Sequence, residues 1–149
     1  MEPQVKPKVF HYEVQVRWNG EKRGILTAKG KPPLEVASPP EFKGHPDIWT
    51  PEDLLVSAVA ACTMTTFLAF AARKEIALDS YECDATGTLE MVEGKFRFSR
   101  VVLRPRIVVA REEDRGKALD VFHQAEASCL VANSLLTKVE GEPDIRVRP

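Results

Sequence analysis

The sequence predicts an α+β fold, in which strands and helices are segregated along the chain. Partly alternating apolar and polar side chains predict strands before residue 38 and again between residues 78 and 110. An uncharged run over 54–72 predicts one long helix, and a second helix-forming stretch begins near residue 111. The resulting order, three strands, a helix, two strands, two helices and a strand, differs from the strict alternation of α/β proteins.

The composition is that of one soluble globular domain, which we expect to span residues 1–149. The chain is 44% hydrophobic and 29% charged, and it is long enough to bury a core. With 21 Lys+Arg against 22 Asp+Glu the net charge is -1, so it lacks the basic footprint of proteins that bind nucleic acid or anionic lipid. The opening residues, MEPQVKPKVF, lack the regions of a signal peptide, and we expect a cytoplasmic protein.

Three short strands are expected before the long helix. Residues 8–18 form the first, and Asn19-Gly20 is a tight-turn signal for a hairpin. The return strand is expected over Gly24 to Ala28 and a third strand over Leu34 to Ala37. The segment SPPEFKGHPDIW, from Ser38 to Trp49, is expected to be a surface loop because its prolines and glycine break regular structure.

The long helix begins at Thr50-Pro51 and continues through the uncharged stretch Leu54 to Ala72. A hydroxyl, a proline at the first helical position and an acid at the third are close to a capping box. The uncharged stretch is long enough for a membrane span, but its hydroxyls and alanines lower its hydrophobicity and no aromatic belt flanks it. We therefore expect protein to bury it on nearly all sides, which in a chain of this size predicts a second subunit.

Beyond Leu78 the sequence predicts a long hairpin, two helices and a last strand. Glu93-Gly94 marks the turn of the hairpin. Pro105 cannot donate to a ladder, so it should lie at an edge, at a bulge or between two strands. The expected elements are a strand over DSYECDATGTLEM, a strand region over Lys95 to Ala110, helices over Arg111 to Ala127 and Cys129 to Val139, and a strand over Pro143 to Val147.

Most familiar catalytic signatures are absent from the sequence. There is no GxGxxG, Walker A, GxSxG or HExxH motif. His11, His45 and His123 lack ligand spacing and no CxxC occurs, so we expect neither a metal site nor a cofactor. A His123–Cys129 nucleophile pair would lack a third group to orient it.

Three cysteines remain as candidates: Cys62, Cys83 and Cys129. An odd number without an export signal argues against structural disulfides and leaves redox or catalytic chemistry. Cys62 lies within the most apolar helix, where an inert buried thiol is the simplest interpretation. Cys129 follows Ser128 at a predicted helix start, where backbone N–H groups stabilise a thiolate. Cys83 is expected to be structural, because neighbouring carboxylates disfavour its ionised form.

Two of the cysteines lie in extended motifs. TPEDLLVSAVAACTMTTFLAFAARKEI places Pro-Glu ten residues ahead of Cys62, and ASCLVANSLL contains Cys-x-Val-x-Asn-x-Leu from Cys129 to Leu135. The two motifs, 67 residues apart, resemble the first and second signatures of the OsmC/Ohr hydroperoxide reductases, and the order of elements extends the resemblance over nearly the whole chain. The chain departs from the family pattern at Thr50, usually Asn, and at Leu130, usually Pro or Ser.

The resemblance implies an OsmC-like fold with strands wrapped around a long buried central helix in an intertwined homodimer. It also implies a thiol-dependent peroxidase that reduces hydroperoxides, organic ones in the Ohr branch, with a dithiol reductant such as a lipoyl group. Cys62 would be the peroxidatic cysteine and Cys129 the resolving one, and Glu52 matches the family's glutamate. The family's arginine comes from the N-terminal hairpin, where Arg23 is the first candidate and Arg17 the second.

The chemistry of that implied site agrees with these residues. Peroxide oxidises a thiolate to a sulfenic acid and a second thiol condenses with it, so two cysteines are the minimum. Burial disfavours a thiolate at Cys62, so a guanidinium should lie nearby and a carboxylate should hold its fork. Ten residues of helix separate Glu52 from Cys62 by about 15 Å, so Glu52 should reach a cysteine across a dimer or act through an arginine.

Two alternatives stay open from the sequence. Glu52 also fits a purely structural role as an acid that favours the positive end of the helix dipole. The whole chain also fits a non-catalytic protein of the same fold that binds a small apolar ligand between helices, with its thiols as spectators.

Overall fold

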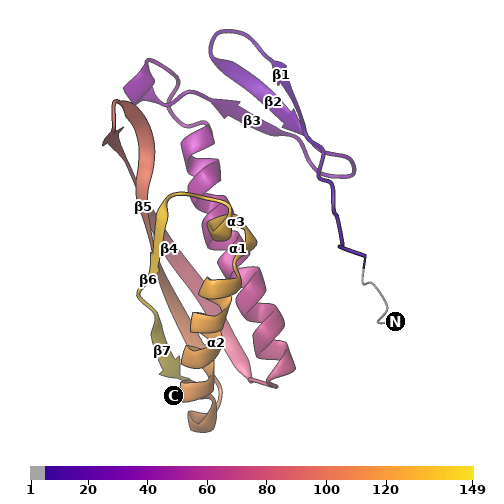
Figure 1. Ribbon diagram of the computed structural model, residues 1–149, viewed down its shortest axis with the longest axis vertical. Helices are drawn as coiled ribbons and strands as arrows, with labels where there is room; N and C mark the ends of the chain where they lie inside the picture. The colour runs from indigo at the N-terminus through magenta and orange to yellow at the C-terminus, as the bar shows by residue number, and fades with distance from the viewer. Residues whose placement is uncertain (1–5) are drawn as a thin grey trace. The chain divides into compact units, whose positions relative to one another are not determined.

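A computed structural model of the protein describes residues 6–149, which fall into two compact units, one ending at Pro51 and one spanning Glu52–Pro149 (Figure 1). The expectation that the opening residues do not form a signal peptide rests partly on residues 1–5, which lie outside the described residues. Strands precede and follow a long helix, and helices and strands are segregated along the chain. The α+β class predicted from the sequence is confirmed.

The first unit contains an antiparallel three-stranded sheet in the order β1-β2-β3. Its strands are β1 (Gln15–Trp18), β2 (Arg23–Thr27) and β3 (Leu34–Ala37). Gly20 takes a φ of 94° in the β1–β2 turn, as the Asn-Gly signal predicts. The first strand is shorter than the predicted 8–18, because only four of its residues pair with β2. The segment 38–49 is a loop that contains one short 3-10 turn, η1 (Pro40–Phe42).

The second unit packs helices on one sheet, as Figure 1 shows. Strands β4 (Leu78–Val92) and β5 (Lys95–Val109) form the predicted long antiparallel hairpin. Two short strands, β6 (Lys138–Gly141) and β7 (Asp144–Val147), pair in parallel with the other edge of β5. The sheet is therefore mixed, with β5 as its central strand.

Pro105 lies inside β5, in register with Cys83 of β4. On the other side of β5, β6 pairs with Arg100 to Leu103 and β7 with Arg106 to Val109. The proline therefore occupies the gap between these two short partners, where its missing N–H breaks no ladder bond on that side. The expectation that Pro105 lies at an edge, at a bulge or between two strands is therefore wrong, because β5 runs through it without a register shift.

The helices of the second unit are α1 (Pro51–Arg73), α2 (Arg115–Ser128) and the short α3 (Leu130–Asn133), with a 3-10 turn η2 (Glu112–Asp114) before α2. The start of α1 at Pro51 confirms the capping signal at Thr50-Pro51.

The predicted helix over Cys129 to Val139 is wrong beyond Asn133, because the chain turns there and enters β6. Val131, Leu135 and Val139 recur every fourth residue as on a helix face, and all three do pack against one core cluster. However, Val139 reaches that cluster as a strand residue paired with Val101 of β5.

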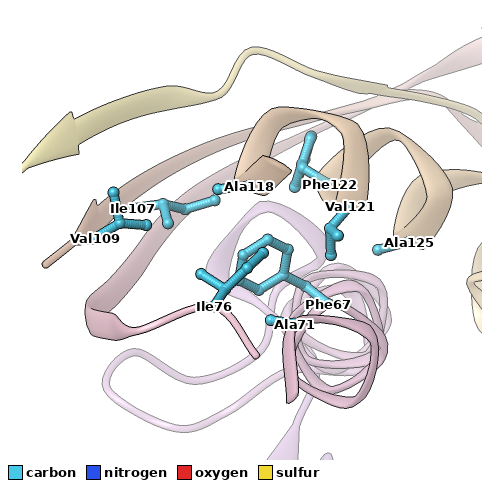
Figure 2. Close-up of a cluster of buried hydrophobic side chains, with 9 residues drawn as sticks. All are labelled: Phe67, Ala71, Ile76, Ile107, Val109, Ala118, Val121, Phe122 and Ala125. Atoms are coloured by element: carbon cyan, nitrogen blue, oxygen red, sulfur yellow. The ribbon is translucent and has the colours of Figure 1, made fainter. Parts of the chain in front are cut away.

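The core of the second unit consists of two clusters that share α1. Figure 2 shows the larger one, in which side chains from α1, β5 and α2 point toward one another. The smaller one centres on Val59, Val101 and Leu103. The buried positions of α1 are Val59, Thr63, Phe67 and Ala71, one stripe at every fourth residue.

The rest of α1 is largely apolar and is half-buried or exposed within this chain. Its most apolar window has a mean hydropathy of 2.0, yet only 22% of that window is buried. By length and composition alone, a helix of this kind is also long enough to cross a membrane. Burial of its remaining face by a second subunit stays a prediction.

Candidate functional site

The candidate site is built around Cys62 and Cys129, which the fold brings into contact. Cys62 lies half-buried in the middle of α1, and Cys129 lies fully buried between α2 and α3. The Cys129 side chain is hydrogen-bonded to the Cys62 sulfur, and both are free thiols. The two thiols are therefore neighbours in the fold.

The break between α2 and α3 creates this contact. Cys129 takes an extended conformation (φ -64°, ψ 113°) at the N-terminal boundary of α3. The Asn133 amide donates from Nδ2 to the Ala127 carbonyl at 3.1 Å, and the Asn133 N–H donates to the Cys129 carbonyl at 2.9 Å. The Cys-x-Val-x-Asn-x-Leu motif thus has a physical basis: Asn133 fixes the break, while Val131 and Leu135 anchor it in the core.

The environment of Cys62 favours its thiolate. Burial raises the pKa of Cys62, but hydrogen bonds from the Val131 N–H, the Cys129 thiol, the Leu130 N–H and the Thr66 hydroxyl outweigh burial and lower the pKa below its ordinary value. The amides after Cys129 were expected to act on the Cys129 thiol, whereas the structure directs them at Cys62. Among the described residues, the donors that lower the pKa of Cys62 all belong to the second unit.

Two hydroxyls that the sequence analysis did not single out also reach Cys62. Thr66 donates from Oγ1 to the Cys62 carbonyl oxygen at 2.8 Å, and Thr65 donates to the same oxygen at 3.1 Å. Both residues lie one helical turn after Cys62, so their spacing of three and four residues was a usable signal.

Glu52 lies in the first turn of α1. Its Oε2 atom is buried and has no hydrogen-bond partner among residues 6–149. Ten residues of the same helix separate it from Cys62, about 15 Å of rise, which two side chains cannot bridge. The residue is therefore placed at the start of the cysteine helix, away from the thiols.

Arg23 and Arg17 differ in their surroundings within the first unit. Arg23 begins β2, is half-buried, and its Nε atom is buried without a hydrogen-bond partner in the described part of the chain. It lines a surface hollow of about 340 Å³ together with Trp18, Val36 and other residues of that unit. Arg17 lies exposed on β1. Burial of an unpaired guanidinium nitrogen favours Arg23 as the functional arginine.

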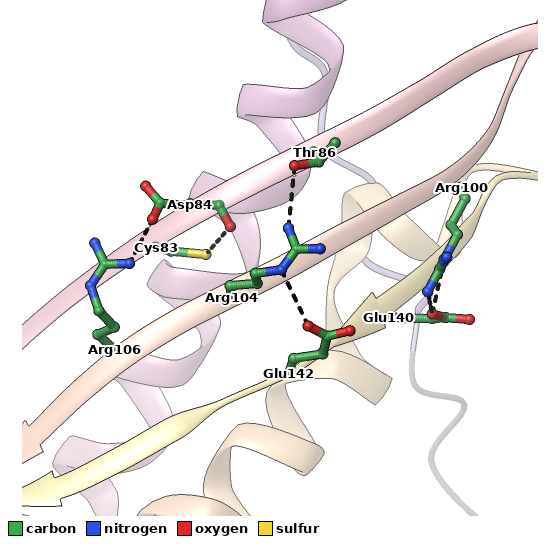
Figure 3. Close-up of polar contacts among 8 residues, drawn as sticks. All are labelled: Cys83, Asp84, Thr86, Arg100, Arg104, Arg106, Glu140 and Glu142. Atoms are coloured by element: carbon green, nitrogen blue, oxygen red, sulfur yellow. Dashed lines mark hydrogen bonds and ion pairs between the residues drawn. The ribbon is translucent and has the colours of Figure 1, made fainter.

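Cys83 has the character expected of a structural thiol. It packs half-buried against the Val59 cluster, and its Sγ contacts the Asp84 carbonyl oxygen at 3.5 Å (Figure 3). Burial is the main cause that raises the pKa of Cys83, and the Asp84 charge adds to it. Unlike Cys62, this thiol is held in its protonated form.

Three arginines of β5, Arg100, Arg104 and Arg106, form ion pairs with neighbouring acids. Arg106 pairs with Asp84 at 2.6 Å and Arg100 with Glu140 at 2.6 Å. Figure 3 draws both pairs. Among residues 6–149, no group of three His, Cys, Asp or Glu side chains is arranged to hold a metal ion.

Solved structures with the same fold cover nearly all of the chain. An OsmC-like protein of unknown function from Vibrio cholerae matches with a TM-score of 0.84 and 23% identity, over 91% of this chain and all (100%) of that one. An organic hydroperoxide resistance protein from Elizabethkingia anophelis matches with a TM-score of 0.74 and 18% identity, over 96% of this chain and 100% of that one. These likenesses establish the fold.

Sequence comparisons agree with the structural ones. The uncharacterized protein YmaD of Bacillus subtilis is 22% identical over 142 residues, 93% of this chain and 95% of that protein. The family model described as OsmC-like protein matches residues 44–143, which include both cysteine motifs and cross the boundary between the two units. The chain therefore belongs to the OsmC-like protein family.

Proposed function

We propose that this protein is a cysteine-based hydroperoxide reductase with Cys62 as the peroxidatic and Cys129 as the resolving residue. The observation that carries the proposal is the contact between the two thiols, of which Cys62 has the stabilised thiolate. The family and the structural relatives named organic hydroperoxide resistance proteins support a peroxide substrate. Organic hydroperoxides are the preferred substrates in this proposal.

The proposed reaction balances with the two thiols and one dithiol. The Cys62 thiolate attacks the distal peroxide oxygen, an S–O bond forms, the O–O bond breaks, and the alkoxide takes up a proton to leave as an alcohol. Cys129 then attacks the Cys62 sulfenic acid, so that a disulfide forms and water leaves. A dithiol reductant, such as a lipoyl group, restores both thiols by exchange and becomes a disulfide itself.

Arg23 and Glu52 complete the proposed site. Each has a buried polar atom without a hydrogen-bond partner in the described structure, and their charges are opposite. Such atoms are costly unless they acquire a partner in the functional state. In the proposal, Arg23 supplies the guanidinium and Glu52 the carboxylate that the resemblance to the OsmC/Ohr family implies for the site.

The functional form in this proposal is a cytoplasmic homodimer that needs no bound cofactor. The exposed apolar surface of α1 supports a second copy as its cover, since such a surface is unfavourable in water. Neither nucleic acid nor a membrane is a partner in this proposal.

A turnover assay with a matched set of cysteine variants tests the proposed function. With cumene hydroperoxide and dihydrolipoamide, we expect the wild type and Cys83→Ser to consume peroxide at similar rates. Cys62→Ser should no longer consume peroxide. Cys129→Ser should lose the peroxide consumption that proceeds through the Cys62–Cys129 disulfide. Equal rates for Cys62→Ser and the wild type would overturn the proposal and favour a ligand-binding protein with spectator thiols.

A further inference from the structure

Two adjacent threonines of α1 bind the same backbone oxygen of the reactive cysteine. The Thr66 hydroxyl lies 2.8 Å from the Cys62 carbonyl oxygen, and the Thr65 hydroxyl lies 3.1 Å from it. The Thr66 hydroxyl is also within hydrogen-bond reach of the Cys62 sulfur. Thr66 is half-buried beside the thiol, whereas Thr65 is exposed.

The Cys62 carbonyl oxygen has more donors than it can use fully. A carbonyl oxygen has two lone pairs. In an α-helix it accepts from the N–H four residues later, here that of Thr66, and both threonine hydroxyls add to this donor. One hydroxyl can therefore turn away while the oxygen keeps two donors.

We propose that Thr66 is a further catalytic residue, whose hydroxyl turns from the Cys62 carbonyl oxygen to the Cys62 sulfur when that thiol ionises, while Thr65 keeps the carbonyl oxygen bonded. The inference deepens the proposed function, because it names a donor that contacts the reacting sulfur. The thiol proton leaves to solvent, and the Thr66 hydroxyl keeps its own proton. The step is therefore a rotation of the hydroxyl hydrogen about the Cβ–Oγ1 bond of Thr66, without proton transfer to Thr66. The rotation supplies one charge-assisted hydrogen bond to the thiolate.

The two threonines therefore have separate roles, and each provides a control for the other. Thr66→Val keeps the branched shape but removes the donor to sulfur. Thr65→Val removes a donor only from the shared carbonyl oxygen. Thr66→Ser retains a hydroxyl at the same position and should rescue the effect. Thr66→Ala provides a second variant without the hydroxyl, should valine disturb the packing of α1.

The pH dependence of Cys62 alkylation by iodoacetamide, resolved by peptide mass spectrometry, tests the inference. We expect Thr66→Val and Thr66→Ala to move the alkylation midpoint to higher pH by about one unit, the typical size of one hydrogen bond to a charged group. Thr65→Val and Thr66→Ser should titrate like the wild type. An unmoved midpoint in both donor-free variants, or an equal shift in Thr65→Val, would overturn the inference.

Alkylation requires no peroxide, so this result is separable from the proposed function. If the wild type fails to reduce peroxide but Thr66→Val still shifts the midpoint, the peroxidase proposal fails and the hydrogen bond to the thiolate stands. If peroxide is reduced and the midpoint does not move, the peroxidase proposal stands and the role of Thr66 falls.

Discussion

At the scale of single residues, Cys62 is governed by opposing effects on its thiolate. Burial alone would raise the pKa of the Cys62 thiol and disfavour its thiolate. Hydrogen bonds from two backbone N–H groups after Cys129, from the Cys129 thiol and from the Thr66 hydroxyl together lower the pKa below the ordinary value. Because the thiolate is the attacking form, the rate of peroxide reduction should rise with pH through this lowered pKa and be constant above it. Stopped-flow rates over a pH series check this. A rate that still rises through the range where an unperturbed cysteine ionises would contradict the expected environment.

The two arginines of the N-terminal hairpin form a second comparison at this scale. Arg23 has a buried, unpaired Nε atom and Arg17 is exposed. We expect Arg23→Ala to lower kcat/KM for cumene hydroperoxide by about tenfold or more, the size of one lost charge-assisted contact. Arg17→Ala should stay close to the wild type. A loss of the same size in both variants, or in Arg17→Ala alone, would show that Arg23 was wrongly chosen.

At the scale of elements, the approach of α2 to the sheet depends on a glycine in β6. A Cβ at Gly141 would overlap the Glu126 carboxylate and lie 2.6 Å from the buried Phe122 ring. We expect Gly141→Ala to lower the free energy of unfolding by about 1–3 kcal/mol, as overpacking does. Gly116→Ala in α2, where a Cβ meets nothing within 4 Å, should be neutral or stabilising by up to about 1 kcal/mol.

Urea unfolding of the two glycine variants beside the wild type measures this difference. Equal stability of Gly141→Ala and Gly116→Ala would contradict the close packing of α2 against β6.

The elements that could be predicted from the sequence are those whose sequence patterns lie within the element itself. Thr50-Pro51 and the uncharged run over 54–72 predict α1, and Asn19-Gly20 predicts the first hairpin. The strand β6 was missed because its Val139 continues the apolar spacing of the preceding helix, and only pairing with β5 makes it a strand.

The candidate site was predictable to the same extent. The motif spacing identifies Cys62 and Cys129. Two of the four donors to the Cys62 thiolate are backbone N–H groups at the α2–α3 break, which no side-chain pattern in the sequence records.

At the scale of the whole molecule, the exposed apolar surface of α1 predicts a homodimer. Leu68 of α1 and Leu119 of α2 are similarly exposed within the chain, at 38% and 41%. Leu68→Glu should convert a dimer to monomer in native mass spectrometry, because a charge would be buried against the second copy. Leu119→Glu should leave the dimer intact. A wild type that is a stable monomer and still reduces peroxide would contradict the proposed homodimer as the functional form.

The central claim is that Cys62 and Cys129 act as one redox pair. Its most direct test is intact-mass and free-thiol analysis of the reduced protein after one equivalent of cumene hydroperoxide, with Cys62→Ser and Cys129→Ser beside it. We predict that the wild type loses two thiols as a Cys62–Cys129 disulfide and keeps Cys83 free, while Cys129→Ser stops at a sulfenic acid or its overoxidised products. Survival of all three thiols in the wild type would contradict the claim.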